Sequence, residues 1–189
     1  ISKDKKLNRN FNFIKNAIQQ NDIYLLKESR IVFTCGAAEE DDFMKTRRGI
    51  LMQYAKKHIK GINFFTAEKL FKAIDDHKST DLLSIESKLA NYSDCILIIL
   101  ESPGAFTELG AFSHLDSLAK KILVINSSEF QSEESFINQG PIKKINKISE
   151  FKKCIYANFE NFGTSINEVS KRIDKLTYQK RKQIDISSQ

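Results

Sequence analysis

The residues with the clearest chemical pattern lie in one segment, Glu101-Ser-Pro-Gly-Ala-Phe-Thr-Glu-Leu-Gly-Ala-Phe112. Pro103 and Gly104 favour a tight turn, and Thr107 is suited to cap the helix that follows it. Free peptide N–H groups and the helix dipole attract an anion such as a phosphate at that point. Glu108 would lie in the first helical turn among small and apolar neighbours, and we predict that it is the catalytic carboxylate of a phosphate- or ribose-binding turn. The other residues expected to bind substrate there are Ser102, Pro103, Gly104 and Thr107.

A second carboxylate, Glu86, lies on the predicted helix 82–90, eight residues before Asp94. A buried strand is predicted over 94–100. Because Glu86 lies on the helix that leads into this strand, its side chain can reach the same cleft at the strand ends. A solvent-facing Glu on a connecting helix is the alternative. If both carboxylates face the cleft, one can act as a nucleophile or cation stabiliser while the other orients or protonates the leaving group. Cleavage of an N-glycosidic bond through an oxocarbenium-like state requires this division of roles.

Small residues follow the predicted strand 30–35, in the run Thr34-Cys-Gly-Ala-Ala38. Their size would let backbone amide groups approach a ligand closely. The residues expected to contact substrate here are Cys35, Gly36 and Ala37. An ordinary loop is the equal alternative. After the next predicted strand, the run Thr66-Ala-Glu68 is better explained by helix capping.

Other types of chemistry have weaker support. His58, His77 and His114 lack metal-ligand spacing and the cysteines form no Cys-x-x-Cys pair, so we expect no metal site. Ser84 and Ser102 have no His or Lys base nearby in the sequence, which disfavours serine hydrolysis.

Strand and helix patterns alternate along most of the chain. The expected strands are 30–35, 62–66, 94–100, 121–125 and 154–156. The expected helices are 43–59, 82–90, 107–118, 141–148 and 166–181. Strand 94–100 has no polar alternation, which is typical of a parallel sheet covered by helices on both faces. We predict an α/β fold with a doubly wound, Rossmann- or flavodoxin-like parallel sheet of four or five strands flanked by helices.

A chain of 189 residues is long enough for one well-buried domain. We divide it into an N-terminal helical extension over 1–29, a central domain over 30–160 and a basic C-terminal helix over 161–189. The extension carries an amphipathic stretch from Phe11 to Ile18, which fits a helix lying on the core or on a partner.

The net charge of +6 is concentrated toward the C-terminus, since residues 120–189 hold 13 Lys and Arg against 8 Asp and Glu. A polyanion such as nucleic acid would suit this excess, and a solvated helix face is the alternative. The longest apolar run, from Cys95 to Leu100, is far too short to span a bilayer. With no signal-like region and three widely spaced cysteines, we expect a cytoplasmic protein with buried thiols.

Four segments taken together resemble a known family. They are Thr34-Cys-Gly36, Leu82-Leu-Ser-Ile-Glu86, the run from Glu101 to Ser113, and Ser135-Phe-Ile-Asn-Gln-Gly-Pro141. Over about residues 30 to 148 the chain is similar to effector proteins of bacterial retrons that carry a nucleoside 2-deoxyribosyltransferase-like domain. The resemblance implies a toxin-like effector of anti-phage defence that cleaves N-glycosidic bonds of NAD or related nucleotides, as substrates and not as cofactors. It also implies a retron reverse transcriptase and its RNA-linked DNA (msDNA) as partners, and leaves a homo-oligomer or filament open.

The resemblance assigns roles to individual residues. Glu108 corresponds to the catalytic glutamate of the deoxyribosyltransferases, and Glu86 to an aspartate that binds or orients the base. The loop Gly36-Ala37 corresponds to their first-strand substrate loop. Where those enzymes have an aspartate six residues before the catalytic glutamate, this chain has Ser102, with Glu101 beside it. This departure favours a hydrolase or a different substrate over transfer between free nucleosides.

The sequence leaves three functions open. The first is an N-glycosidase that consumes NAD or a related nucleotide. The second is an enzyme that removes bases from nucleic acid, or that transfers ADP-ribosyl or deoxyribosyl groups. The third is a module that senses a nucleotide without catalysis.

Overall fold

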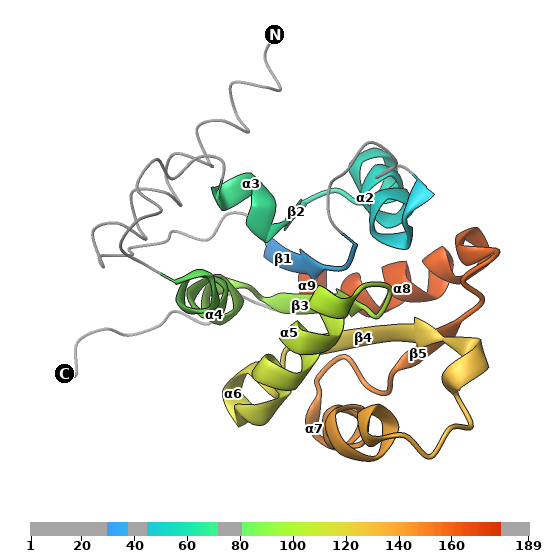
Figure 1. Ribbon diagram of the computed structural model, residues 1–189. Helices are drawn as coiled ribbons and strands as arrows, with labels where there is room; N and C mark the ends of the chain where they lie inside the picture. The colour runs from blue at the N-terminus through green and yellow to red at the C-terminus, as the bar shows by residue number, and fades with distance from the viewer. Residues whose placement is uncertain (1–29, 38–44, 72–80, 179–189) are drawn as a thin grey trace, which may run out of the picture.

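The computed structural model describes residues 30–37, 45–71 and 81–178 (Figure 1). The amphipathic stretch from Phe11 to Ile18, His77 and the basic residues after 178 lie outside this part of the chain. The proposed division into three parts therefore stays a prediction.

Within the described residues, five parallel strands form one sheet in the order β2-β1-β3-β4-β5. The strands are β1 (Arg30–Cys35), β2 (Ile62–Phe65), β3 (Cys95–Ile99), β4 (Ile122–Ser127) and β5 (Ile155–Ala157). This order is that of flavodoxin-like sheets, and it confirms the predicted α/β fold. The side chains of β3 are fully buried, because helices cover both faces of the strand.

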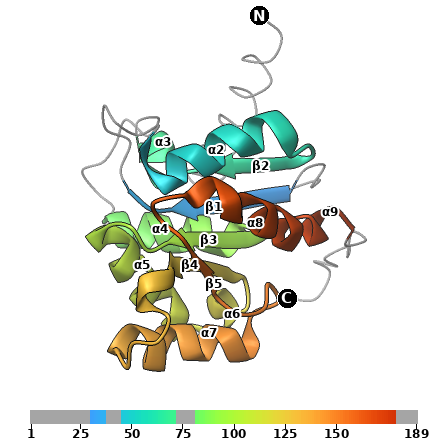
Figure 2. The ribbon, with the colours of Figure 1, turned by 90° about the vertical axis from the view of Figure 1, so that its right-hand side faces the viewer.

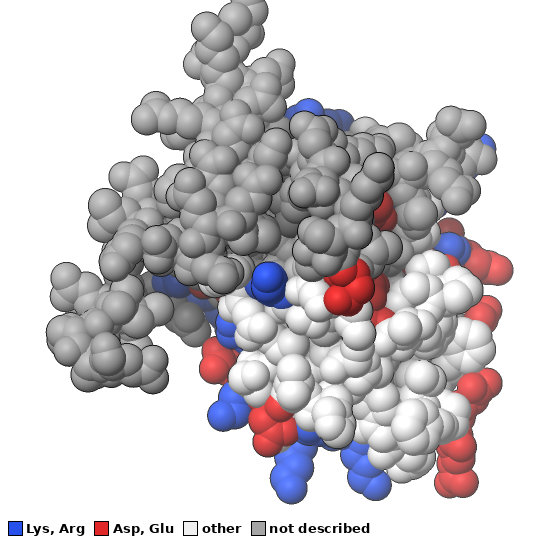
Figure 3. All heavy atoms as spheres, turned by 60° about the vertical axis from the view of Figure 1, so that its left-hand side comes forward, with Lys and Arg blue, Asp and Glu red and all other residues white. Residues whose placement is uncertain are grey.

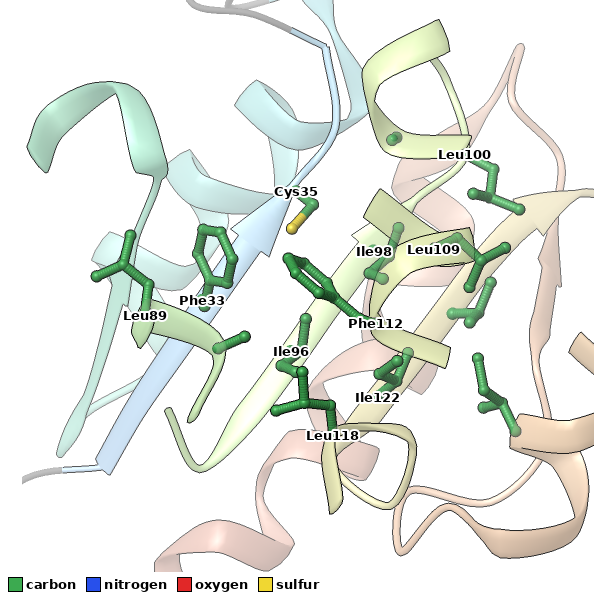
Figure 4. Close-up of a cluster of buried hydrophobic side chains, with 14 of the residues drawn as sticks. Phe33, Cys35, Leu89, Ile96, Ile98, Leu100, Leu109, Phe112, Leu118 and Ile122 are labelled. Atoms are coloured by element: carbon green, nitrogen blue, oxygen red, sulfur yellow. The ribbon is translucent and has the colours of Figure 1, made fainter. Parts of the chain in front are cut away.

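Two helical layers enclose the sheet. Their members are α2 (Arg47–His58), α3 (Ala67–Phe71), α4 (Leu82–Tyr92), α5 (Pro103–His114), α6 (Asp116–Ala119), α7 (Lys143–Ile148), α8 (Ile166–Ile173) and α9 (Lys175–Tyr178). The layer of α3, α4, α5, α6 and α7 packs on Phe33, Ile96 and Ile98, as the close-up in Figure 4 shows for α5. The layer of α2, α8 and α9 packs on Val32 and Leu97 of the opposite face, and Figure 2 shows α8 in front of the sheet.

Several predicted helices differ from the observed ones. The predicted helix 107–118 corresponds to two helices, α5 and α6, which are separated at Leu115. The predicted helix 166–181 is divided, because α8 ends at Ile173 and α9 begins at Lys175. The predicted helix 141–148 is α7, preceded by a π-helical turn, Asn138–Ile142, that contains Pro141. Proline has no N–H to donate, so a local departure from α-helical hydrogen bonding accommodates it.

The three cysteines are free and buried, as the sequence predicted. Among the described residues, no helix combines the length and the apolar character that crossing a membrane would require. Figure 3, which turns the left-hand side of Figure 1 forward, shows a broad uncharged area with Lys and Arg gathered mainly along its lower edge.

Candidate functional site

Most of the predicted site residues lie at the end of β1 or on the segment that follows β3, and these two strands are neighbours in the sheet. Glu86 lies on α4. The chain leaves β1 toward α2 in one layer and leaves β3 toward α5 in the other. Such a reversal of strand order opens a crevice outside the carboxyl ends of the strands, and ligands of doubly wound sheets bind there. The position of the segment that follows β3 therefore agrees with a ligand-binding function.

The start of α5 differs from the sequence prediction. The helix begins at Pro103, and Ser102 is its N-cap, with Oγ accepting a hydrogen bond from the Ala105 N–H at 3.3 Å. Thr107, predicted as the cap, is exposed inside the helix, and its hydroxyl donates to the Pro103 carbonyl at 3.0 Å. Serine as N-cap followed by proline is a strong helix start, and it prevails over the turn that Pro-Gly suggested. Glu108 consequently lies in the second helical turn.

Glu108 is partly buried, and the thiol of Cys35 is hydrogen-bonded to its carboxyl group. Burial, followed by the negative charge of Glu86, raises the pKa of Glu108 from 4.5 to about 8. Burial and the same two glutamates hold the pKa of the Cys35 thiol well above its usual value, so the thiol keeps its proton. Figure 4 shows Cys35 at the end of β1 with its sulfur turned toward Phe112 of α5.

The charges of two more glutamates, Glu86 and Glu68, raise the pKa of Glu108. Glu86, on α4, is partly buried, and its pKa is raised by burial and then by the charge of Glu68. Glu68, on α3, accepts hydrogen bonds from Arg48 at 2.6 and 3.2 Å. Burial opposes ionisation of Glu68, but the hydrogen bonds and charge of Arg48, together with hydrogen bonds from the Glu68 backbone and Thr66, outweigh it and hold the pKa of Glu68 below its usual value. We call Glu68, Glu86 and Glu108 the carboxylate cluster; Arg48 is the guanidinium that lies against it.

Backbone groups after β1 are held by the segment after β3. The Glu101 carboxylate, with its side chain only 2% exposed, accepts a hydrogen bond from the Ala37 N–H at 3.2 Å. The hydroxyl of Ser102 donates to the Gly36 carbonyl at 3.1 Å. A Cβ at Gly36 would lie 3.0 Å from Oε1 of Glu101 and 3.1 Å from side-chain carbons of Arg48, so any other residue would require these side chains to shift by a few tenths of an ångström. The Ala37 N–H is thus engaged within the protein.

The structure therefore brings together Cys35, Glu86 and Glu108, which the sequence had placed in separate segments. Pro103 and Gly104 are exposed in the first turn of α5. A Cβ at Gly104 would meet only the Ser102 hydroxyl, at 3.9 Å, so the fold itself does not demand glycine there.

Sequence reasoning missed Arg48, and it explained Glu68 by helix capping alone. A buried arginine has the same sequence appearance as an exposed one, so no local signal marked Arg48. A signal did exist for Glu101, because a charged residue directly after an unbroken apolar strand must find partners at the end of the sheet.

Within the carboxylate cluster, Glu86 and Glu108 can share a proton. Because the charge of Glu86 raises the pKa of Glu108, the pair resists losing its last proton near neutral pH. A protonated carboxyl can protonate a leaving base, and an ionised one can stabilise a cation at the adjoining carbon. In the described part of the chain, no three His, Cys, Asp or Glu side chains are grouped so that they could hold a metal ion.

Comparison with known proteins identifies the family. The family described as STM3845 retron effector protein matches residues 44–189. The chain belongs to this retron effector family. An Escherichia coli protein named "Retron Ec73 putative ribosyltransferase/DNA-binding protein" is 40% identical over 124 residues, which are 64% of this chain and 39% of that protein. The E. coli protein of the same description from retron Ec86 is 36% identical over 119 residues, 62% of this chain and 38% of its own length.

This retron effector chain thus spans less than two-fifths of the curated relatives that it matches. The names of those relatives state two properties, ribosyl transfer and DNA binding. These names describe whole proteins, and the aligned residues cover only part of each.

Proposed function

We propose that this retron effector transfers a ribosyl group from an N-glycosidic bond to an acceptor, with Glu108 and Glu86 as its two reacting carboxylates. The observation that carries the proposal is the coupling of these glutamates to each other and to Cys35 at the reversal point of the sheet. The names of the two E. coli relatives support transfer more directly than hydrolysis.

The proposed reaction breaks the bond between the sugar C1′ and a base nitrogen, and the bonding electrons leave with the base. Positive charge that develops at C1′ favours the ionised form of Glu108, so the proton held by the pair moves through Glu86 to the departing base. Glu108 then stabilises the sugar cation or forms an ester with it. The acceptor adds to C1′ and gives up its own proton, which restores the protonated pair.

Water is an alternative acceptor, and with water the protein would be a glycosidase that consumes NAD or a related nucleotide. One observation favours hydrolysis. Ser102 stands where the deoxyribosyltransferases have an aspartate, and its hydroxyl is used to cap α5 and to bond Gly36. The position of that aspartate is therefore occupied here by a hydroxyl that is already engaged within the protein.

The test is to incubate the protein with NAD, nucleosides, deoxynucleosides and single-stranded DNA, alone and with the retron reverse transcriptase and msDNA. Mass spectrometry follows the released base and the product that carries the sugar. Glu108→Gln should reduce base release by about 10²-fold or more while substrate binding persists. Glu150→Gln, on an exposed residue, is the matched control.

The products separate the functions. A sugar joined to an acceptor supports transfer, and free ribose phosphate or ADP-ribose supports hydrolysis. Loss of base from DNA supports the nucleic-acid alternative. Wild-type base release from Glu108→Gln would refute the catalytic assignment, and ligand binding with no base release from wild-type protein would support a nucleotide sensor.

We further propose DNA, together with the retron reverse transcriptase, as a partner. Lys171 and Lys175 are exposed on α8 and α9. Partial desolvation, then the charges of Lys152 and Arg172, lower the pKa of Lys175, which indicates crowded positive charge. A phosphate backbone would relieve that repulsion.

A further inference from the structure

Glu101 is a buried carboxylate that the proposed reaction does not use. Oε1 accepts hydrogen bonds from the N–H groups of Ala37 at 3.2 Å and Arg48 at 2.9 Å, and Oε2 accepts one from Arg47 at 2.8 Å. We propose that Glu101 is a positioning residue, which fixes the start of α2 against the end of β1 and so holds Arg48 beside the carboxylate cluster.

The start of α2 explains why a carboxylate is needed. The helix has no acidic residue in its own first turn, and the side chain of its N-cap, Thr46, accepts a hydrogen bond from the Gly49 N–H at 2.9 Å. The N–H groups of Arg47 and Arg48 precede that one and have no partner inside the helix. Glu101 accepts both and places a negative charge at the positive end of the helix dipole.

The same contacts control where the Arg48 side chain lies. Its backbone N–H is bonded to Glu101, and its guanidinium is bonded to Glu68. The positive charge of Arg48 acts on Glu108 and on Cys35 and favours the ionised form of each. Glu101 therefore acts on the site only through another residue.

Gly36 is part of this arrangement. A Cβ there would lie 3.0 Å from the Glu101 carboxylate and 3.1 Å from Arg48, closer than real Cβ contacts normally are. Gly36→Ala would require these two side chains to shift by a few tenths of an ångström, without removing a hydrogen-bonding group. It therefore offers a second way to displace Arg48.

The experiment measures Glu108 in the ligand-free protein, by ¹³C NMR titration of glutamate side-chain carboxyl groups, with the signal assigned by its loss in Glu108→Gln. In Glu101→Gln, removal of one negative charge would by itself lower the pKa of Glu108. Displacement of Arg48 would instead raise the pKa of Glu108, because a positive charge that favours its ionised form would move away. We expect a rise of about half a pKa unit, a fraction of the one to three units that a close opposite charge produces.

Asp94 provides a matched control at the other end of β3. Its Oδ2 accepts the Ile31 N–H at 2.8 Å, so Asp94→Asn also weakens a carboxylate–backbone bond between β1 and β3. Asp94→Asn should lower stability without changing the titration of Glu108. Gly36→Ala should raise the pKa of Glu108, and it replaces Glu101→Gln if that variant does not fold.

An unchanged or lowered pKa of Glu108 in the folded Glu101→Gln and Gly36→Ala variants would overturn the proposal. An equal rise in Asp94→Asn would do the same, because the effect would then be a general consequence of loosening. The inference takes its importance from the proposed role of Glu108, but the titration needs no substrate. It can therefore succeed or fail independently of ribosyl transfer.

Discussion

Replacing Glu108 with glutamine should stabilise the protein in alkaline solution while it removes activity. The folded protein holds the pKa of Glu108 at about 8, against 4.5 for an ordinary glutamate. Its proton is thus bound more tightly in the folded state than in the unfolded state. The resulting stabilisation is fully present below pH 4.5 and is lost as the pH rises through about 8.

The size of the effect follows from the two pKa values. At about 1.36 kcal/mol per pKa unit, the difference corresponds to an upper limit of about 5 kcal/mol. Glu108 is partly exposed and coupled to Glu86, so we expect about 2 to 3 kcal/mol. Glutamine has the shape of a protonated glutamate and cannot ionise, so Glu108→Gln should lack most of this pH dependence.

Urea unfolding followed by circular dichroism is the appropriate assay, because the chain has no tryptophan. The unfolding free energy of the wild type should fall between about pH 5 and 8.5, and that of Glu108→Gln should fall much less. Glu86→Gln removes the neighbouring charge and lowers the pKa of Glu108 in the folded state, so its decline should end at a lower pH and be smaller. Parallel curves for wild type and Glu108→Gln would refute the buried, protonated carboxyl and with it the proton sharing that we propose.

Glu86→Gln should also reduce base release by about 10²-fold, while circular dichroism shows an unchanged fold. Wild-type turnover in this variant would show that Glu86 takes no part in the reaction. Gly104→Val should change the unfolding free energy by less than about 1 kcal/mol, since its Cβ has room, but should weaken substrate affinity. Equal affinity measured by calorimetry would argue against a ligand at the start of α5. Lys171→Glu with Lys175→Glu should weaken co-purification with reverse transcriptase and msDNA, most strongly at low salt, and a salt-independent association would contradict direct phosphate contacts. Arg172 is left intact in that test, because it bonds the carbonyls of Phe151 and Lys153 and pairs with Glu168.

Much of the fold could be predicted from local patterns. The unbroken apolar run over β3 indicated burial on both faces, and the strands 30–35, 62–66 and 121–125 were apparent from similar runs. Alternation with helices required parallel pairing. The start of α5 was misplaced, because Ser-Pro-Gly is compatible with both a turn and a helix start. In the structure the helix start is observed, and Ala105, Leu109 and Phe112 of this helix pack against the sheet.

The sequence by itself determined the parallel sheet and singled out Glu108, since hydrophobic runs and a distinctive motif are local properties of the chain. Only the tertiary structure decided what surrounds that glutamate. Cys35, Glu68 and Glu86 come from three other elements. The pKa of Glu108 depends on burial, on the charges of Glu86, Arg48 and Glu68, and on the hydrogen bond with Cys35. The same holds for Glu101, whose three backbone partners lie more than fifty positions away in the sequence. Desolvation and charge coupling act through space, so they exist only once the strands and helices have packed together.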